Sequence, residues 1–208
     1  MKKLLGGLLI FSVVLTGCSS DEDELMDFYN AFQETVEVEK EIGDVTARFD
    51  ELEAEKAELQ ESLETASIEE LPEISADLVE NTEARVAQLD EEVAIMAESR
   101  SRMETSEQYI SKISNESNQE QAQSLVDAMK ERYSAHGEMI GSYKTVLESE
   151  RSIFEYLGEE DISQDEVDER LNNLNEEYQQ VQEDAQTFSE QTENVNEIKR
   201  EIESRIEG

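Results

Sequence analysis

The sequence contains little of what usually interrupts helices or cross-links a chain: one proline, eight glycines and a single cysteine in 208 residues. Because proline and glycine are the strongest breakers of regular structure, their scarcity leaves long helical segments uninterrupted. A single cysteine cannot form an intramolecular disulfide, so packing alone has to hold the fold. Tryptophan is absent, which removes the largest of the flat aromatic faces that glycan-binding clefts commonly use.

Basic residues are also few. Lysine and arginine number 17 against 54 aspartates and glutamates, so the formal net charge is −37 at pH 7. Binding to nucleic acid or to an anionic membrane surface requires clustered basic side chains, and these partners are therefore excluded. The same charge opposes direct contact with anionic wall polymers unless cations intervene. Strong acidity can also indicate disorder, but disordered chains lack the regular apolar spacing that this sequence has.

The strongly apolar part of the chain is confined to its start. Met1-Lys2-Lys3 is followed by the apolar run Leu4 to Leu15 and then by Thr16-Gly17, which is the order of a secretory signal. The run is shorter than the ~20 residues that a membrane-spanning helix needs. We therefore predict that residues 1–17 are a signal peptide outside the fold. Its removal takes away two lysines and leaves 15 basic and 54 acidic residues, a formal charge of −39.

The cysteine stands at the end of this segment. Leu15, Thr16, Gly17 and Cys18 resemble the lipobox of bacterial prolipoproteins, which implies that a diacylglyceryl group is attached to the Cys18 thiol and that cleavage occurs just before it. The alternative is an ordinary secretory signal in which a cysteine happens to follow the cut. Two acyl chains would anchor the protein durably, whereas one chain binds only marginally. We therefore expect the membrane to be one partner, contacted through acyl chains of the palmitate type on Cys18.

Beyond an acylated cysteine and acidic tether at residues 18–24, apolar residues recur every three or four positions, the spacing of helices that pack side by side. The pattern predicts four helices, at about 24–66, 76–114, 119–157 and 164–206. The stripe of the second helix is the least regular, because Thr82, Arg100 and Glu107 fall among its apolar residues. The stripe of the third contains one charged residue, Glu150, and the single histidine, His136.

Residues that begin or end helices lie between these segments. Pro72 separates the first from the second, and the polar stretch 114–118 separates the second from the third. Gly158 is expected to end the third helix in a left-handed conformation, and Ser163 with Glu166 is expected to form a capping box for the fourth. Short connections make consecutive helices antiparallel, so we predict an all-α fold, a four-helix up-and-down bundle over residues 25–208, about 60 Å long. A single extended rod and an intermolecular coiled coil are the alternative arrangements.

The predicted topology places the two ends of the bundle at different distances from the membrane. The tether reaches only ~20 Å, so the 114–118 turn and the end of the chain lie near the membrane, while the loops at 65–75 and 157–164 form the far end. Four apolar residues in those loops are candidates for contact with a partner: Ile68, Leu71, Ile74 and Ile162. The alternative is that they close the end of the core.

Catalytic and metal-binding patterns are missing from the sequence. The Glu-x-x-His pairs that build di-metal sites in helical bundles do not occur, and His136 lies on an apolar stripe, where a hydrogen-bonded core histidine is expected. The acidic stretch that starts at Asp161 has Glu166 where a calcium-binding loop requires glycine. We therefore predict no enzyme activity, no catalytic residues, no metal and no cofactor.

A lipobox, an immediate acidic tether and about 200 residues of long acidic helices with almost no proline together resemble the YkyA-type cell-wall-binding lipoproteins of Gram-positive bacteria. The resemblance covers Cys18 to Gly208 and implies a four-helix up-and-down bundle that is lipid-anchored on the outer face of the cell membrane. It favours a non-catalytic module that binds peptidoglycan, another wall polymer or a wall-associated protein. The alternative is a helical scaffold that binds another envelope protein without touching the polymer.

Overall fold

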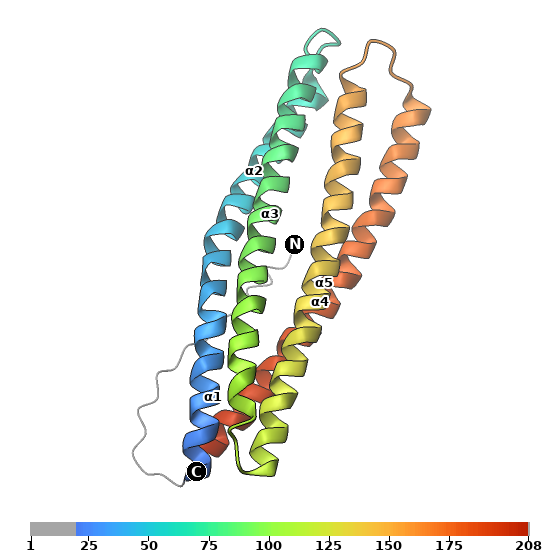
Figure 1. The fold of residues 1–208 in the computed structure, drawn as a ribbon. Coiled ribbons are helices and arrows are strands. Elements are labelled where there is room, and N and C mark those ends of the chain that lie inside the picture. The colour runs from blue at the N-terminus through green and yellow to red at the C-terminus, as the bar shows by residue number, and fades with distance from the viewer. Residues whose placement is uncertain (1–19, 208) are drawn as a thin grey trace.

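The computed structural model describes residues 20–207, which form an all-α bundle of antiparallel helices (Figure 1). In chain order the elements are α1 (Ser20–Val36), the 3-10 helix η1 (Glu37–Glu41), α2 (Ile42–Thr65), α3 (Leu71–Ile110), α4 (Glu116–Leu157) and α5 (Gln164–Glu207). α1, η1 and α2 together form one rod, and α3, α4 and α5 form the other three, so the predicted four-helix bundle is confirmed. The predicted lipobox residues, Leu15, Thr16, Gly17 and Cys18, lie outside the described residues.

The acidic segment that was predicted to belong to a tether is instead the first turn of α1. The helix begins at Ser20, and its first turn is acidic, which is favourable because the positive end of the helix dipole lies there. This turn is also tied to the α3–α4 loop, because the backbone N–H of Ser114 donates to the Glu24 carboxylate. The prediction of a tether at residues 18–24 therefore extends too far, because residues 20–24 belong to α1.

The first rod is not one continuous α-helix, as predicted for residues 24–66, but changes to a 3-10 helix at Glu37–Glu41. A 3-10 helix takes three residues per turn instead of 3.6, so it rotates the buried face of the rod relative to that of α1. The rotation brings Val38 and the charged Glu39 into the bundle, and α2 resumes the buried face at Val45. The interruption therefore places a carboxylate inside the core.

The helix ends between the rods differ from the prediction. α3 begins at Leu71 rather than near residue 76, because Pro72 lies in its first turn, where a missing backbone N–H costs nothing. Gly158 ends α4 with φ −83° and ψ −5°, a right-handed conformation, so the predicted left-handed ending is wrong.

Side-chain caps also occur at other positions than predicted. Glu166 pairs with Arg170 at 2.9 Å, and the Ser163 backbone N–H donates to the Tyr156 hydroxyl at 2.8 Å, so the predicted capping box of α5 is replaced by other contacts. α4 is capped by Asn115, whose side-chain oxygen accepts from a backbone N–H of the first turn at 3.1 Å.

The two halves of the bundle are packed differently. In the half that contains α1, this helix contacts α3, α4 and α5 around the largest apolar cluster, which includes Leu25, Phe28, Phe32, Met103, Leu125, Met129 and Ile202. In the other half α2 contacts α3, but within the described chain no backbone contact joins α2 to α4 or α5. The apolar clusters there are smaller and include half-buried side chains such as Leu59, Leu63 and Leu174. The core is therefore enclosed more completely in the α1 half than in the α2 half.

The acidic surface is expected to limit stability at low ionic strength. Exposed pairs such as Arg48–Glu91 each contribute under ~1 kcal/mol, and 17 basic residues cannot neutralise 54 acidic ones. We expect the midpoint of thermal unfolding to rise with NaCl, because the screening length falls from ~30 Å at about 0.01 M to ~8 Å at about 0.15 M. Circular dichroism melts in NaCl and in choline chloride check this, since screening does not depend on the cation. A midpoint that does not move with either salt would show that repulsion is not limiting.

Candidate functional site

Three chain segments meet at one end of the bundle: the start of α1, the α3–α4 loop and the end of α5 (Figure 1). The Asn118 side-chain amide donates to the Asp21 carbonyl oxygen at 3.3 Å. The Arg205 guanidinium of α5 donates to the Ser117 hydroxyl at 2.9 Å and to the Asn118 side-chain oxygen at 3.3 Å. These contacts hold together the end of the bundle from which the chain leaves towards Cys18, and we call it the basal end.

The loops at residues 66–70 and 158–163 lie at the opposite end, which we call the distal end (Figure 1). Of the four residues predicted to contact a partner, Ile68 is 82% exposed and Ile162 is 37% exposed. Leu71 is half-buried, and Ile74 packs against an apolar core cluster. Ile74 therefore closes the core, whereas Ile68 and Ile162 remain accessible.

Sequence reasoning missed a further exposed apolar residue near this end. Leu171, in the second turn of α5, is 42% exposed although it belongs to the apolar stripe that predicted the fourth helix. In the distal half α5 has α4 beside it but, over the described residues, makes no backbone contact with α2. The buried side chains of α5 are Val195 and Ile202, both in the basal half. A stripe shows which face of a helix is apolar but not whether a second neighbour covers that face.

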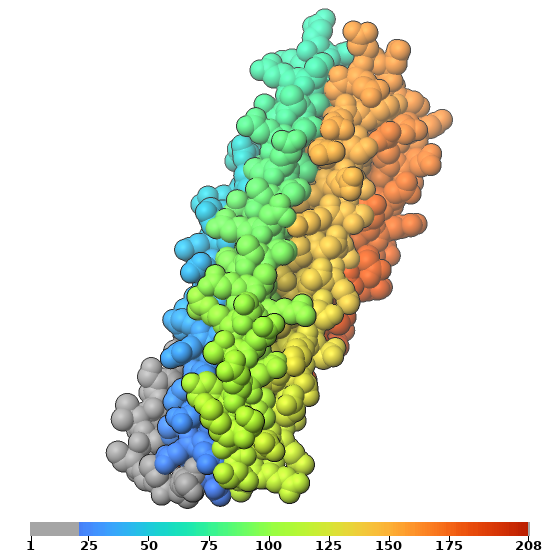
Figure 2. All heavy atoms as spheres, in the orientation of Figure 1, coloured from blue at the N-terminus to red at the C-terminus, as the bar shows by residue number. Residues whose placement is uncertain are grey.

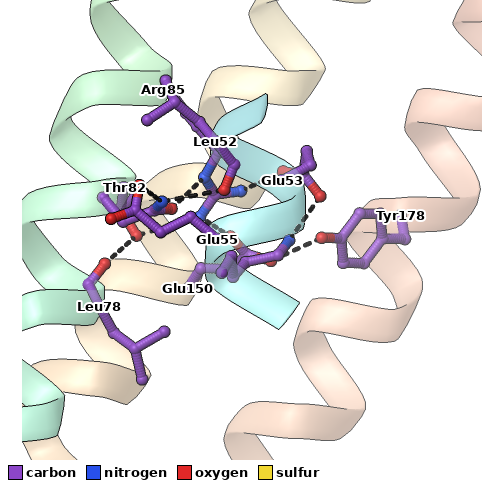
Figure 3. Close-up of polar contacts among 10 residues, drawn as sticks. Leu52, Glu53, Glu55, Leu78, Thr82, Arg85, Glu150 and Tyr178 are labelled. Carbon is purple, nitrogen blue, oxygen red and sulfur yellow. Dashed lines mark hydrogen bonds and ion pairs between the residues drawn. The ribbon is translucent and has the colours of Figure 1, made fainter. Parts of the chain in front are cut away.

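A buried ionic network crosses the distal half of the bundle (Figure 3). At its centre the fully buried Arg85 of α3 donates to the Glu150 carboxylate of α4 at 2.5 Å and to the Glu53 carboxylate of α2 at 2.6 Å. Lys56 of α2 donates to Glu150 at 3.1 Å, and the Tyr178 hydroxyl of α5 donates to the same carboxylate at 2.6 Å. Glu150 therefore receives hydrogen bonds from the three other rods.

The charges in this network stabilise one another. Burial alone would raise the pKa of the Glu150 carboxyl, but Arg85, Lys56 and the Tyr178 hydrogen bond outweigh it and hold that pKa below its ordinary value of 4.5. Burial and the hydrogen bond to Glu150 raise the pKa of the Tyr178 hydroxyl, so it stays protonated as a donor. The groups are satisfied by one another across four rods. Such ion pairs can form in only one register of the helices. We therefore interpret the network as structural.

A second polar layer lies nearer the middle of the bundle. The Glu39 carboxylate of η1 accepts from the Ser99 hydroxyl of α3 at 2.6 Å and pairs with Arg132 of α4 at 2.9 Å. The Ser99 and Tyr133 hydroxyls are hydrogen-bonded at 2.7 Å, and Arg132 donates to the Thr192 hydroxyl of α5 at 3.2 Å. This layer also joins all four rods, and it uses the carboxylate that the 3-10 interruption turns inward.

The two layers explain why the stripe predicted for the second helix is irregular. The inward positions of α3 follow alternating steps of three and four residues and carry Leu78, Thr82, Arg85, Leu89, Glu92, Met96, Ser99, Met103, Ser106 and Ile110, all buried except the half-buried Glu92. Arg100, which the prediction placed on the stripe, is exposed. Sequence reasoning missed Arg85, although its spacing from Thr82 and Leu89 is that of a core position.

The single histidine is buried and hydrogen-bonded, as predicted. His136 is 3% exposed, its Nε2 lies 2.9 Å from the Glu92 carboxylate, and its ring packs edge-on against Phe188 with the ring centroids 5.4 Å apart. In residues 20–207 no three His, Cys, Asp or Glu side chains come together as a metal site. None of the helices described is both long enough and apolar enough to cross a membrane.

A cavity of ≈ 300 Å³ lies between α3 and α4, lined by Thr82, Glu83, Val86, Lys144, Leu147, Glu148 and Arg151. Its charged side chains are of both signs. Lys144 pairs with Asp90 on α3, and Arg151 pairs with Glu155 on α4 at 3.4 Å. The two basic side chains at the cavity are therefore paired with acidic side chains of the protein.

Comparison with known proteins gives three matches. Residues 23–205 match the family model YkyA, described as "Putative cell-wall binding lipoprotein". The chain is 24% identical over 201 residues to the "Uncharacterized lipoprotein YkyA" of Bacillus subtilis (strain 168), and the match covers 95% of this chain and 90% of that protein. The fold is similar to a crystal structure of a conserved protein of unknown function from Staphylococcus aureus, with a TM-score of 0.77 and 22% identity over 90% of this chain and 97% of that one.

Proposed function

This chain belongs to the YkyA family of lipoproteins, and on that premise we propose that it is a lipid-anchored, non-catalytic interaction protein on the outer face of the cell membrane of a Gram-positive bacterium. It binds the cell wall or a wall-associated protein. The observation that carries this proposal is the family match, which extends over residues 23–205 and so includes all four rods. The absence of catalysis is supported by His136 and the buried carboxylates, which have their hydrogen-bond partners inside the protein.

The anchor is a lipid on Cys18, placed there after cleavage of the signal peptide 1–17. α1 begins two residues after Cys18, so the basal end of the bundle stands next to the membrane. The rods are about 60 Å long at 1.5 Å per residue, so the distal end is the part of the protein that extends furthest towards the wall. Contact with the partner is made there, by the exposed Ile68 and Ile162 and the half-buried Leu71.

We expect the purified lipoprotein to sediment with isolated cell-wall sacculi in the presence of Mg²⁺ and several-fold less after addition of EDTA. The strongly acidic chain repels anionic wall polymers, and divalent cations relieve that repulsion. Immunoblots of the pellet and the supernatant measure the bound fraction, and an acidic helical protein of similar charge serves as the control. A bound fraction that equals the control, with and without Mg²⁺, would contradict wall binding.

A second candidate is a helical scaffold that binds another envelope protein and does not touch the polymer. The exposed apolar side chains at the distal end favour it, because helical proteins commonly recognise partner helices through such contacts. Sedimentation with sacculi separates the two candidates, since the scaffold stays in the supernatant unless its protein partner is also present.

A further inference from the structure

The apolar residues that the structure leaves exposed are concentrated at the distal end. Within residues 20–207 four large apolar side chains are exposed: Ile68 (82%), Ile162 (37%), Leu171 (42%) and Val93 (38%). Three of them belong to the distal loops and the second turn of α5, whereas Val93 lies within α3. We call Ile68, Ile162 and Leu171 the distal patch. Apolar side chains gathered at one place on a soluble surface mark an interaction site more often than scattered ones do.

The loops that carry Ile68 and Ile162 lie at the same end of the bundle. Figure 2 shows the atoms of these α2–α3 and α4–α5 loops side by side. The end of α4 packs closely on the start of α3, since a Cβ on Gly158 would lie 3.4 Å from the Cβ of Ser75. Leu171 stands seven residues after the first residue of α5, or ~10 Å along the helix. Leu171 therefore lies roughly two turns along α5 from the α4–α5 loop that carries Ile162.

The surface around the distal patch is mainly acidic. Residues 57–84 and 152–169 form the outer part of the four rods and contain 17 acidic residues and no lysine, arginine or histidine. The nearest basic residue on α5 is Arg170, which pairs with Glu166 at 2.9 Å and lies over the Tyr156 ring. The distal end therefore presents apolar side chains on an acidic surface.

We propose that the distal patch docks a cationic amphipathic helix of a partner protein. Apolar side chains spaced by three, four and seven residues along such a helix lie about 5–10 Å apart, which is comparable to the ~10 Å between the start of α5 and Leu171. Its lysines or arginines face the surrounding carboxylates, and complementary charge speeds association and selects against other partners. A second copy of this chain would bring 17 further acidic residues against the same surface, and an anionic polymer is repelled by it.

This inference deepens the proposed function by naming the chemistry of the protein partner. The test uses the acylated protein in nanodiscs of zwitterionic lipid, with empty discs as the blank. The probes are a fluorescent amphipathic helix of leucine and lysine and the same peptide with glutamate in place of lysine. We expect fluorescence anisotropy to show saturable binding of the lysine peptide, weakening as NaCl is raised, and no binding of the glutamate peptide.

The location is tested with Ile68→Ser, Ile162→Ser and Leu171→Ser combined. We expect this triple variant to bind the lysine peptide at least about tenfold more weakly, because the apolar contacts are lost. The matched control is Val93→Ser, which also removes an exposed apolar side chain and should change binding less than about twofold. Circular dichroism checks that both variants keep the helicity of the wild type.

Three outcomes would overturn the inference: equal binding of the glutamate peptide, no binding of the lysine peptide up to about 100 µM, or an equal loss in Val93→Ser. If the triple variant loses helicity, the single variant Ile68→Ser decides, since this side chain is 82% exposed and its change does not disturb the core. Sedimentation with sacculi is measured separately. Retained sedimentation without peptide binding would leave the proposed wall binding intact and reject only the docked helix.

Discussion

Replacing Glu150 by alanine is expected to lower the free energy of unfolding by about 3–5 kcal/mol. The change removes the carboxylate that Arg85, Lys56 and Tyr178 share. It leaves the fully buried Arg85 guanidinium with Glu53 as its remaining acidic neighbour, and a buried charge without its partner costs far more than an intact ion pair contributes. Urea unfolding at neutral pH, followed by circular dichroism, measures the difference.

The matched control is Glu91→Ala, which also removes a carboxylate from an arginine pair between two rods. Arg48 and Glu91 are 2.8 Å apart but both exposed, so this change should cost under ~1 kcal/mol. If the two variants lose the same stability, the buried network does not hold the rods together.

The dependence on pH distinguishes lost charge from lost packing. Because the pKa of Glu150 is lower in the folded than in the unfolded chain, its contribution is complete above the ordinary value of 4.5 and disappears as the pH falls through the folded-state value. The stability difference between wild type and Glu150→Ala should therefore be constant near neutral pH and shrink below about pH 4.5. A difference that persists unchanged to about pH 2 would assign the effect to packing.

Cys18→Ala is expected to abolish incorporation of a palmitate analogue in growing cells. The change removes the thiol to which we propose the lipid is attached, and the sequence contains no second cysteine to replace it. Two acyl chains at about 0.8 kcal/mol per buried CH₂ supply the whole of the proposed anchor. In-gel fluorescence of the labelled protein, normalised to an immunoblot, measures the loss.

The control for this experiment is Ser19→Ala, which changes the neighbouring residue and keeps the thiol. Its labelling should equal that of the wild type. Equal labelling of Cys18→Ala would show that Cys18 carries no lipid, and the segment would then be an ordinary secretory signal.

The number, order and direction of the four rods could be predicted from the spacing of apolar residues. Phe28, Phe32, Leu125 and Met129 lie on the predicted stripes, and all of them are buried. This success has a physical reason, because long helices with short connections have few ways to hide an apolar face other than against the next helix.

The polar layers could not be predicted in the same way. Arg85 and Glu39 are charged residues, which usually face solvent, and their burial depends on partners that are far away in the sequence. The partner of Arg85 is Glu150 and that of Glu39 is Arg132, each on another rod. The Glu39 side chain points into the core because of the 3-10 interruption, and the spacing of apolar residues did not predict that interruption. The exposure of Leu171 was missed for a related reason. The apolar spacing of α5 does not show whether another helix covers that face, and in the described chain α2 makes no backbone contact with α5.

The start of α1 at Ser20 also bears on how far the protein can act from its anchor. If the proposed lipid on Cys18 anchors the bundle, only Ser19 separates the anchored residue from the first helical residue, so the bundle would stand close to the membrane. The contact of Glu24 with Ser114 ties the start of α1 to the α3–α4 loop. With the proposed anchor, the distal patch would lie up to about 60 Å from the lipid headgroups. A partner protein would have to present its binding segment at that distance from the membrane. Its length as well as its charge would therefore decide whether it can bind.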